Sequence, residues 1–162
     1  MFQIGDKIVH PMHGAGVIEG VVEEKVGGSR VQFFVFRMPV SGLTLKIPTA
    51  NTQIIGVRGV HAASEIETVI RQIPRLNVDM TANWNHRYRE NMQRLKSGDL
   101  MEVAQVIKGL VCRSAGRTLS NGERKMLHSA KQILLSEVVL AKDMTYGEAE
   151  RWIESAMLTE TE

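Results

Sequence analysis

Apolar positions in the first 58 residues follow the alternation and spacing of short β-strands. Segments rich in Val, Ile, Phe and Thr are separated by short stretches that contain Gly, Pro or Asn; they read DKIVHP, GAGVIEGVVEEK, VQFFVFRM, LTLKIPT and TQIIGVRGV. In LTLKI, three apolar residues alternate with Thr44 and Lys46, which predicts the apolar side chains inside and Lys46 outside. Five short strands at this spacing predict a small β-barrel over residues 1–58.

The segment VQFFVFRM is apolar on both faces. Phe34 and Phe36 lie on one face, and Val31, Phe33 and Val35 lie on the other. In one interpretation the second face packs on the rest of the protein, and in the other the strand is a docking surface for a partner. The sequence alone favours packing and leaves docking open.

From residue 59 the apolar positions recur with the period of a helix. Four segments begin with capping-box spacing, in which a side-chain oxygen caps the first turn and a Glu three residues later reaches back; the pairs are Ser64 with Glu67, Asp99 with Glu102, Ser120 with Glu123, and Thr145 with Glu148. A further helix is predicted from about Asn83 or Trp84 to Ser97-Gly98. The chain is therefore predicted to be α+β, with the barrel followed by an all-α bundle of about five helices over residues 59–162.

Trp84 stands at the start of one predicted helix. With apolar residues 4, 8 and 11 positions later it follows the spacing of a buried stripe, which favours packing in the core. Its place at the helix end, followed by His86, Arg87 and Arg89, favours instead an exposed indole that inserts at a DNA base step while the cations hold phosphates. Periodicity alone favours burial, and both interpretations stay open.

Charge is distributed unevenly although the net charge of the chain is only +2. Residues 84–131 carry 10 Lys and Arg against 4 Asp and Glu, whereas residues 132–162 carry 2 against 7. The basic middle fits a phosphate-facing surface of modest, salt-sensitive affinity. Such a surface works best when another contact holds it near DNA.

The helix predicted after Ser120 adds cations to this surface. Arg124, His128 and Lys131 form a polar stripe, and Lys125 lies one position round the helix. The stripe is either a solvated face or a row of phosphate contacts. Free amide groups at the start of the helix would favour an anion there.

Other chemistry is sparse in the sequence. No Walker loop, HExxH or CxxC is present, and His10 and His13 in HPMH have no third ligand at suitable spacing. The single cysteine, Cys112, excludes an internal disulfide. The N-terminus lacks signal-peptide features and no apolar run is long enough to span a bilayer. We expect a cytoplasmic protein without catalysis, metal or cofactor.

Six stretches, in order along the chain, resemble one family. IGDKIVHPMHGAGVIEG, LTLKIPTAN, NWNHRYREN, LKSGD, LSNGERKML and AKQIL are similar to motifs of the CarD/CdnL family of bacterial transcription regulators, and the first part also resembles the Tudor-like, SH3-like barrel of transcription-repair coupling factor. The resemblance implies a barrel that binds the β subunit of RNA polymerase by pairing strands. It also implies a helical domain that contacts promoter DNA at the upstream edge of the melted bubble and stabilises the open complex.

The resemblance also implies roles for single residues. Trp84 matches the family's minor-groove wedge, Arg89, Arg113 and Arg124 match basic positions on the DNA-facing surface, and Lys46 matches a polymerase contact.

With their neighbours, these positions define two expected sites. The expected DNA-binding residues are Trp84, His86, Arg87, Arg89, Arg113, Arg124 and Lys125. The expected polymerase-binding residues are Lys25, Phe34, Phe36 and Lys46.

Two positions depart from the family. His86 stands where relatives have Arg, so a phosphate contact there would depend on pH. Glu24 followed by Lys25 stands where a second polymerase-facing Arg can occur.

The expected function is regulation of transcription initiation. A monomer in the cytoplasm, associated with the nucleoid, would bind the polymerase β subunit through its barrel and promoter DNA through its helices, with little base specificity. The alternative is an RNA- or ribosome-associated adaptor that uses the same basic helical face.

Overall fold

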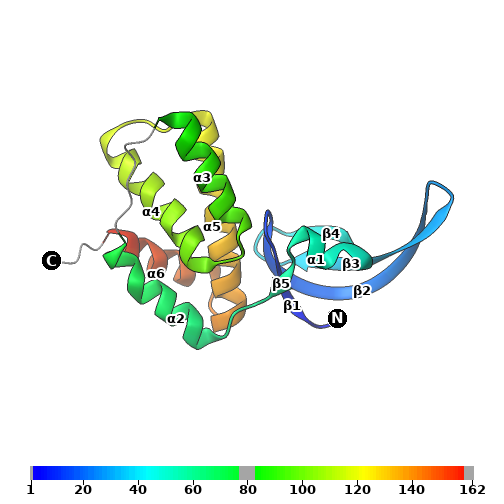
Figure 1. Ribbon diagram of the computed structural model, residues 1–162. Coiled ribbons are helices and arrows are strands. Elements are labelled where there is room, and N and C mark those ends of the chain that lie inside the picture. Colours follow the sequence, from blue (N-terminus) through cyan, green and yellow to red (C-terminus); the bar gives the residue numbers. More distant parts are fainter. Residues whose placement is uncertain (1, 77–82, 159–162) are drawn as a thin grey trace.

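The computed structural model describes residues 2–76 and 83–158, which form a β domain and a helical domain lying side by side (Figure 1). The β domain holds one five-stranded antiparallel sheet, and five helices of ten or more residues follow it in the described part of the chain. The predicted α+β class and the order of its two parts are confirmed.

The sheet has the strand order β4-β3-β2-β1-β5. Its strands are β1 (Lys7–His10), β2 (Gly14–Val26), β3 (Ser29–Met38), β4 (Leu43–Pro48) and β5 (Arg58–Gly59). β2 and β3 are longer than their neighbours and continue past them as a two-stranded ribbon (Figure 1). The predicted last strand is wrong over its first half, because α1 (Thr52–Ile55) occupies that segment, directly after the 3₁₀ turn η1 (Thr49–Asn51).

Phe34 and Phe36 lie in the core of the β domain. Their exposed fractions are 3% and 0%, and they pack with buried residues of the neighbouring strands. β3 is an inner strand, so its backbone is also paired on both edges. The expectation that these two side chains contact polymerase is therefore wrong, because burial leaves them nothing to offer a partner.

The alternation predicted in LTLKI holds in the middle of β4 and fails at its start. Ile47 is buried, Leu45 packs against the core and Lys46 is exposed, as predicted. Leu43 is 53% exposed, although the alternation along the strand predicts that its side chain points inward. It pairs with Met38, the last residue of β3, so it lies at the end of the sheet.

The helical domain contains α2 (Ala63–Gln72), η2 (Ile73–Arg75), α3 (Trp84–Lys96), α4 (Leu100–Gly116), α5 (Asn121–Lys142) and α6 (Tyr146–Leu158). Each predicted stripe supplies residues to one buried core, including Ile66, Ile107, Leu134 and Ile153. α5 contacts α2, α3, α4 and α6, and also β1 and β2.

Two of the predicted capping boxes are confirmed. In both, at Ser120 with Glu123 and at Thr145 with Glu148, the capping oxygen accepts the Glu amide and the Glu carboxylate accepts the amide of the capping residue. Asp99 caps α4 by accepting from the amide of Met101 at 2.8 Å.

The box predicted at Ser64 is wrong. α2 begins one residue before Ser64, and no side chain caps it. The Glu67 carboxylate instead pairs with Lys142 of α5.

The turn between β1 and β2 packs against the middle of α5. Gly14 has φ +105°, and a Cβ at this position would lie 2.4 Å from Ser136 Oγ and 3.0 Å from the carbonyl oxygen of Gln132. The next amide, of Ala15, donates to Ser136 Oγ at 2.8 Å. The lack of a side chain at Gly14 thus lets the β domain approach α5 at backbone distance.

A buried carboxylate of α5 joins the two domains. Glu137 is fully buried and accepts from both terminal nitrogens of Arg58, at 2.8 and 2.7 Å, and from the amide of His61 at 2.8 Å. Burial raises the pKa of this carboxyl, but the hydrogen bonds and charge of Arg58, with His61, outweigh it and hold the pKa below 4.5. The bonded groups come from β5, the following segment and α5, so this cluster holds the domains in one relative placement.

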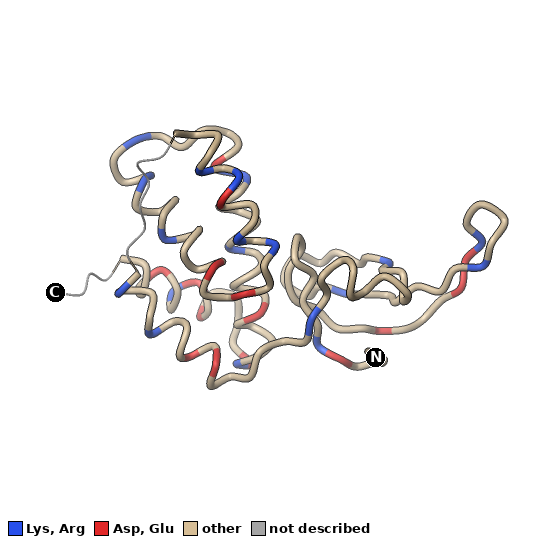
Figure 2. The backbone as a smooth tube through the Cα atoms, viewed as in Figure 1, with Lys and Arg blue, Asp and Glu red and all other residues tan. Residues whose placement is uncertain are grey.

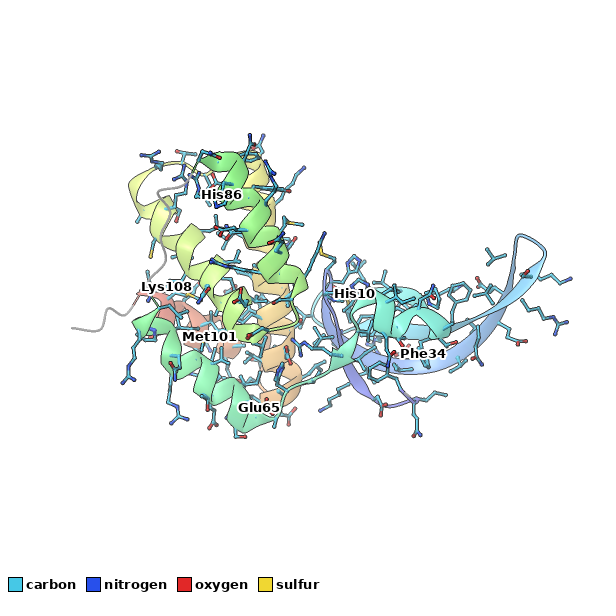
Figure 3. All side chains as sticks on the ribbon, viewed as in Figure 1. His10, Phe34, Glu65, His86, Met101 and Lys108 are labelled. Atoms are coloured by element: carbon cyan, nitrogen blue, oxygen red, sulfur yellow. The ribbon has the colours of Figure 1, made fainter. Side chains whose placement is uncertain are left out.

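His10 should make the stability of this junction depend on pH. Figure 3 places it on the side of the β domain that faces the helices. Burial, followed by repulsion from His13, lowers the pKa of His10 from 6.5 to about 4. The unfolded chain therefore binds the proton first, so the stabilisation is complete above pH 6.5 and decreases as the pH falls towards 4.

NMR titration of the His10 ring measures this prediction directly. We expect a pKa near 4 in the folded protein, and a higher value in His13→Gln because the neighbouring charge is gone. A folded-state pKa of 6.5 for His10 would contradict it. Stability measured between pH 7 and 5 should then change less in His10→Gln than in the natural sequence.

Candidate nucleic-acid interface

Three helix ends meet at the end of the helical domain that lies away from the sheet. α3 and α5 begin there and α4 ends there (Figure 1). Lys and Arg positions gather around this end in Figure 2, and His86 is labelled there in Figure 3. We call this region, formed by residues 84–89 and 113–125, the basic end.

Trp84 is partly exposed at the basic end. Its exposed fraction is 41%, whereas Leu95 of the same stripe is 2% exposed. The stripe is therefore buried at Leu95 and partly exposed at Trp84, because α3 begins at Trp84 and has no earlier turn to cover the indole. Burial, which periodicity favoured, is the wrong interpretation for Trp84 itself.

The indole is held in one orientation by contacts from two helices. It stacks on Tyr88 with ring centroids 5.1 Å apart and an interplanar angle of 18°. Its Nε1 donates to Ser120 Oγ at 3.2 Å. A Cβ at Gly122 would lie 3.3 Å from the ring, so the missing side chain lets Trp84 lie against the first turn of α5.

Arg87 is buried and Arg113 is only partly exposed. Arg87 is 8% exposed, and the side chain of Arg113 is 17% exposed. Both guanidinium groups approach the buried carboxylate of Glu123, at 3.8 and 3.2 Å. The expectation that Arg87 contacts DNA is corrected because this residue is buried, whereas the expectation for the partly exposed Arg113 stays a prediction; both residues join α3, α4 and α5 below Trp84.

Four of the expected cations are exposed and belong to the two helices that hold the indole. α3 presents His86 and Arg89, and α5 presents Arg124 and Lys125. The ring of His86 lies 3.7 Å from Glu90, so protonation of His86 would form an ion pair within α3.

The first turn of α5 is capped by side chains of the chain itself. Ser120 and Glu123 occupy its first turn with reciprocal hydrogen bonds, and the Glu123 carboxylate is already there. The expectation of an anion at this helix end stays a prediction, and the nearby Glu123 carboxylate disfavours it. Further along α5, His128 lines a cleft beside Met12 and His13 of the β domain.

The exposed face of the sheet carries a cross-strand ion pair. Lys46 on β4 pairs with Glu24 on β2, and their side chains are 51% and 42% exposed. Glu24 lies opposite Val31 and Lys46 lies opposite Val35, so Phe33 lies between them on β3. Phe33 is half-buried and is not part of the core cluster. Val31, Phe33 and Val35 are all half-buried, so the choice between packing and docking for this second face stays open.

Lys25 is exposed, but on the opposite face of the sheet from Lys46. Lys25 lies opposite Arg30, which is on the same face of β3 as the buried Phe34 and Phe36. Lys46 lies opposite Val35, which is on the other face. The structure therefore brings Lys46 together with Glu24 and does not bring it together with Lys25.

Two kinds of feature are absent from the described residues. No group of three or more His, Cys, Asp or Glu side chains there is placed to hold a metal ion. None of the described helices combines the length and apolar character of a membrane span.

Comparison with known families matches both domains. The model described as "CarD-like/TRCF RID domain" matches residues 2–60, and the model described as "CarD, C-terminal domain" matches residues 68–154. The chain belongs to the CarD family. Membership supports a transcription regulator that interacts with RNA polymerase.

Two known proteins are similar to this chain over different lengths. A protein of Bacillus subtilis named "Putative transcription factor YdeB" is 34% identical over 145 residues, which cover 90% of this chain and 95% of that protein. A solution NMR structure of the 72-residue N-terminal domain of Myxococcus xanthus CarD is 25% identical, with a TM-score of 0.32, and covers 36% of this chain and 79% of that one.

Sequence reasoning missed the residues that hold the two candidate sites in place. Ser120 was identified as a cap, but not as the acceptor for the indole, and Gly122 was not singled out. Glu24 was noted as a departure from the family, but not as the partner of Lys46. Each partner lies on a different element, so spacing along the chain carries no signal of these contacts.

Proposed function

We propose that this protein stabilises the promoter open complex by binding two partners at once. The β domain, residues 1–58, binds the β subunit of RNA polymerase through the sheet face around Lys46. The helical domain, residues 59–162, inserts Trp84 into the minor groove at the upstream edge of the bubble. In this proposal the protein acts as a monomer in the cytoplasm, at the nucleoid.

The observation that carries this proposal is the state of Trp84. An indole that is 41% exposed, stacked on a second ring and hydrogen-bonded through its nitrogen is already oriented before DNA arrives. Inserting an aromatic wedge stabilises kinked or unstacked DNA relative to the closed duplex. The wedge needs little reorganisation because its contacts are made within the protein.

Cations on both helices that hold the indole support the same proposal. His86 and Arg89 closely follow Trp84 on α3, and Arg124 and Lys125 closely follow Ser120, the partner of the indole, on α5; all four side chains are exposed. Phosphate contacts of this kind attract DNA without reading its sequence. We therefore propose weak, salt-sensitive binding to DNA alone, with promoter differences that arise from deformability.

The junction between the domains fixes the proposed polymerase-binding face and Trp84 relative to each other. Glu137 and Ser136 tie α5 to the β domain through buried hydrogen bonds. A polymerase-bound β domain then raises the effective concentration of Trp84 at one place on the promoter. Two modest interactions can act together in this way.

The lifetime of open complexes tests the proposal. A cognate polymerase on a short-lived promoter is challenged with competitor, with and without this protein. We expect a longer lifetime when the protein is present. An unchanged lifetime at saturating protein, together with a preference for single-stranded RNA over forked DNA, would favour the RNA-adaptor alternative.

Lys46→Glu should weaken binding to a polymerase β fragment about tenfold, because a negative charge replaces a positive one at the proposed interface. Isothermal titration measures the loss. The control is the double variant Glu24→Lys with Lys46→Glu, which restores the ion pair within the sheet in reversed order. Full recovery in the double variant would mean that Lys46 acts only within the sheet and would contradict a polymerase contact.

A further inference from the structure

A single carboxylate joins the three helix ends beneath Trp84. Glu123 is 5% exposed on the first turn of α5. Its Oε2 lies 3.2 Å from Nε of Arg113, at the end of α4, and 3.8 Å from a terminal nitrogen of Arg87, on α3. Removing the charge would weaken the contacts of both guanidinium groups at once.

The other oxygen of the same carboxylate orients the residue that holds the indole. Ser120 Oγ donates to Glu123 Oε1 at 3.2 Å and accepts from the Glu123 amide at 3.1 Å. With its own hydrogen engaged, Ser120 Oγ presents a lone pair to Trp84 Nε1, which donates to it at 3.2 Å. A hydroxyl free to rotate would present its hydrogen to the indole part of the time.

We propose that Glu123 is a positioning residue for Trp84. Through Ser120 it sets the plane of the indole, and through Arg87 and Arg113 it holds the ends of α3 and α4 against α5 below that plane. This inference rests on the proposed role of Trp84 as a wedge.

One consequence concerns base specificity. The indole Nε1 is engaged with Ser120 in the protein, so the ring offers DNA its carbon edge and no hydrogen-bond donor. An apolar wedge distinguishes base steps by how easily they unstack and does not read base edges. The positioning contact therefore makes insertion tolerant of sequence.

Tryptophan fluorescence tests the positioning role without DNA. The chain has two tryptophans, so Trp152→Phe leaves Trp84 as the only reporter. In this background, Glu123→Gln keeps an oxygen for Ser120 and removes the charge that holds Arg87 and Arg113. We expect lower anisotropy and stronger acrylamide quenching of Trp84, with the released fraction of the indole rising about fivefold.

The matched control is Glu102→Gln. Glu102 is also the third residue after a helix cap and also pairs with an arginine, Arg94, at 3.5 Å, but its side chain is 39% exposed and lies on α4. This variant should leave the Trp84 signal unchanged. An equal change in both variants, or no change in Glu123→Gln, would overturn the positioning role.

A second pair of variants keeps the test decisive if Glu123→Gln folds poorly. Ser120→Ala removes the acceptor for Nε1 and should release Trp84, whereas Ser120→Thr keeps a hydroxyl and should restore the signal. Release in both, or in neither, would overturn the inference.

Open-complex lifetime then separates the two proposals. If Trp84 is a wedge, Glu123→Gln should shorten the lifetime towards that of Trp84→Ala. A released indole in Glu123→Gln, combined with equal lifetimes for the natural protein and Trp84→Ala, would overturn the wedge and leave the positioning contact standing.

Discussion

Replacing Trp84 by alanine should shorten the lifetime of the open complex about tenfold, because an aromatic ring stacked at a base contributes about 1 to 3 kcal/mol. The fold should survive, since the indole is 41% exposed and α3 is capped by the side chain of Asn83 rather than by Trp84. Affinity for a polymerase β fragment should be unchanged, because that contact is assigned to the other domain. Competitor-challenge lifetimes and titration with the fragment measure the two effects.

Two variants control for loss of the ring. Trp84→Phe keeps an aromatic ring and should retain part of the lifetime. Trp152→Phe alters the other tryptophan, which packs against the helical core, and should leave the lifetime unchanged. An equal loss of lifetime and of polymerase affinity in Trp84→Ala, or an unfolded variant, would contradict the proposed role of Trp84 as a wedge.

Replacing Glu137 by alanine should lower the free energy of unfolding by about 3 to 5 kcal/mol, because it leaves the Arg58 guanidinium partly buried without its partner. The same change removes the acceptor for the His61 amide. Chemical denaturation followed by circular dichroism measures the loss. We also expect a shorter open-complex lifetime, since the domains lose a contact that fixes their relative placement.

An exposed ion pair supplies the comparison. Glu19 lies 3.2 Å from Arg37, but their side chains are 44% and 60% exposed, so Glu19→Ala should cost about 0 to 1 kcal/mol. Equal losses in Glu19→Ala and Glu137→Ala would contradict the role given to burial. Because the folded-state pKa of Glu137 is lowered, its stabilisation is complete above pH 4.5 and decreases as the pH falls through the lower folded-state value.

The helices were predictable because their signals are local. The boxes at Ser120 and Thr145, the cap at Asp99 and the glycine after Ser97 each act within one turn, where sequence spacing and spatial distance agree. The failures also have local causes. Ser64 has the right residue type, but α2 begins one residue earlier.

The site was predictable in its residue types and not in its exposure. Trp84 and Arg87 lie three residues apart in one basic segment, yet one is partly exposed and the other is buried against Glu123. Likewise, Phe34 and Phe33 are neighbours, and only Phe34 enters the core. Burial depends on which other elements cover a position, and that information is spread along the chain.

The sequence by itself determined the α+β order, most helix ends and the family, because capping, periodicity and motifs depend on residues close together in the chain. Only the tertiary structure decided that Glu123 joins Arg87, Arg113 and Ser120 beneath the indole. It likewise decided that Glu137 bonds Arg58, a residue 79 positions away in the chain. Those contacts form only when packing brings distant helices and strands together and removes water from charged groups that spacing alone presents as exposed.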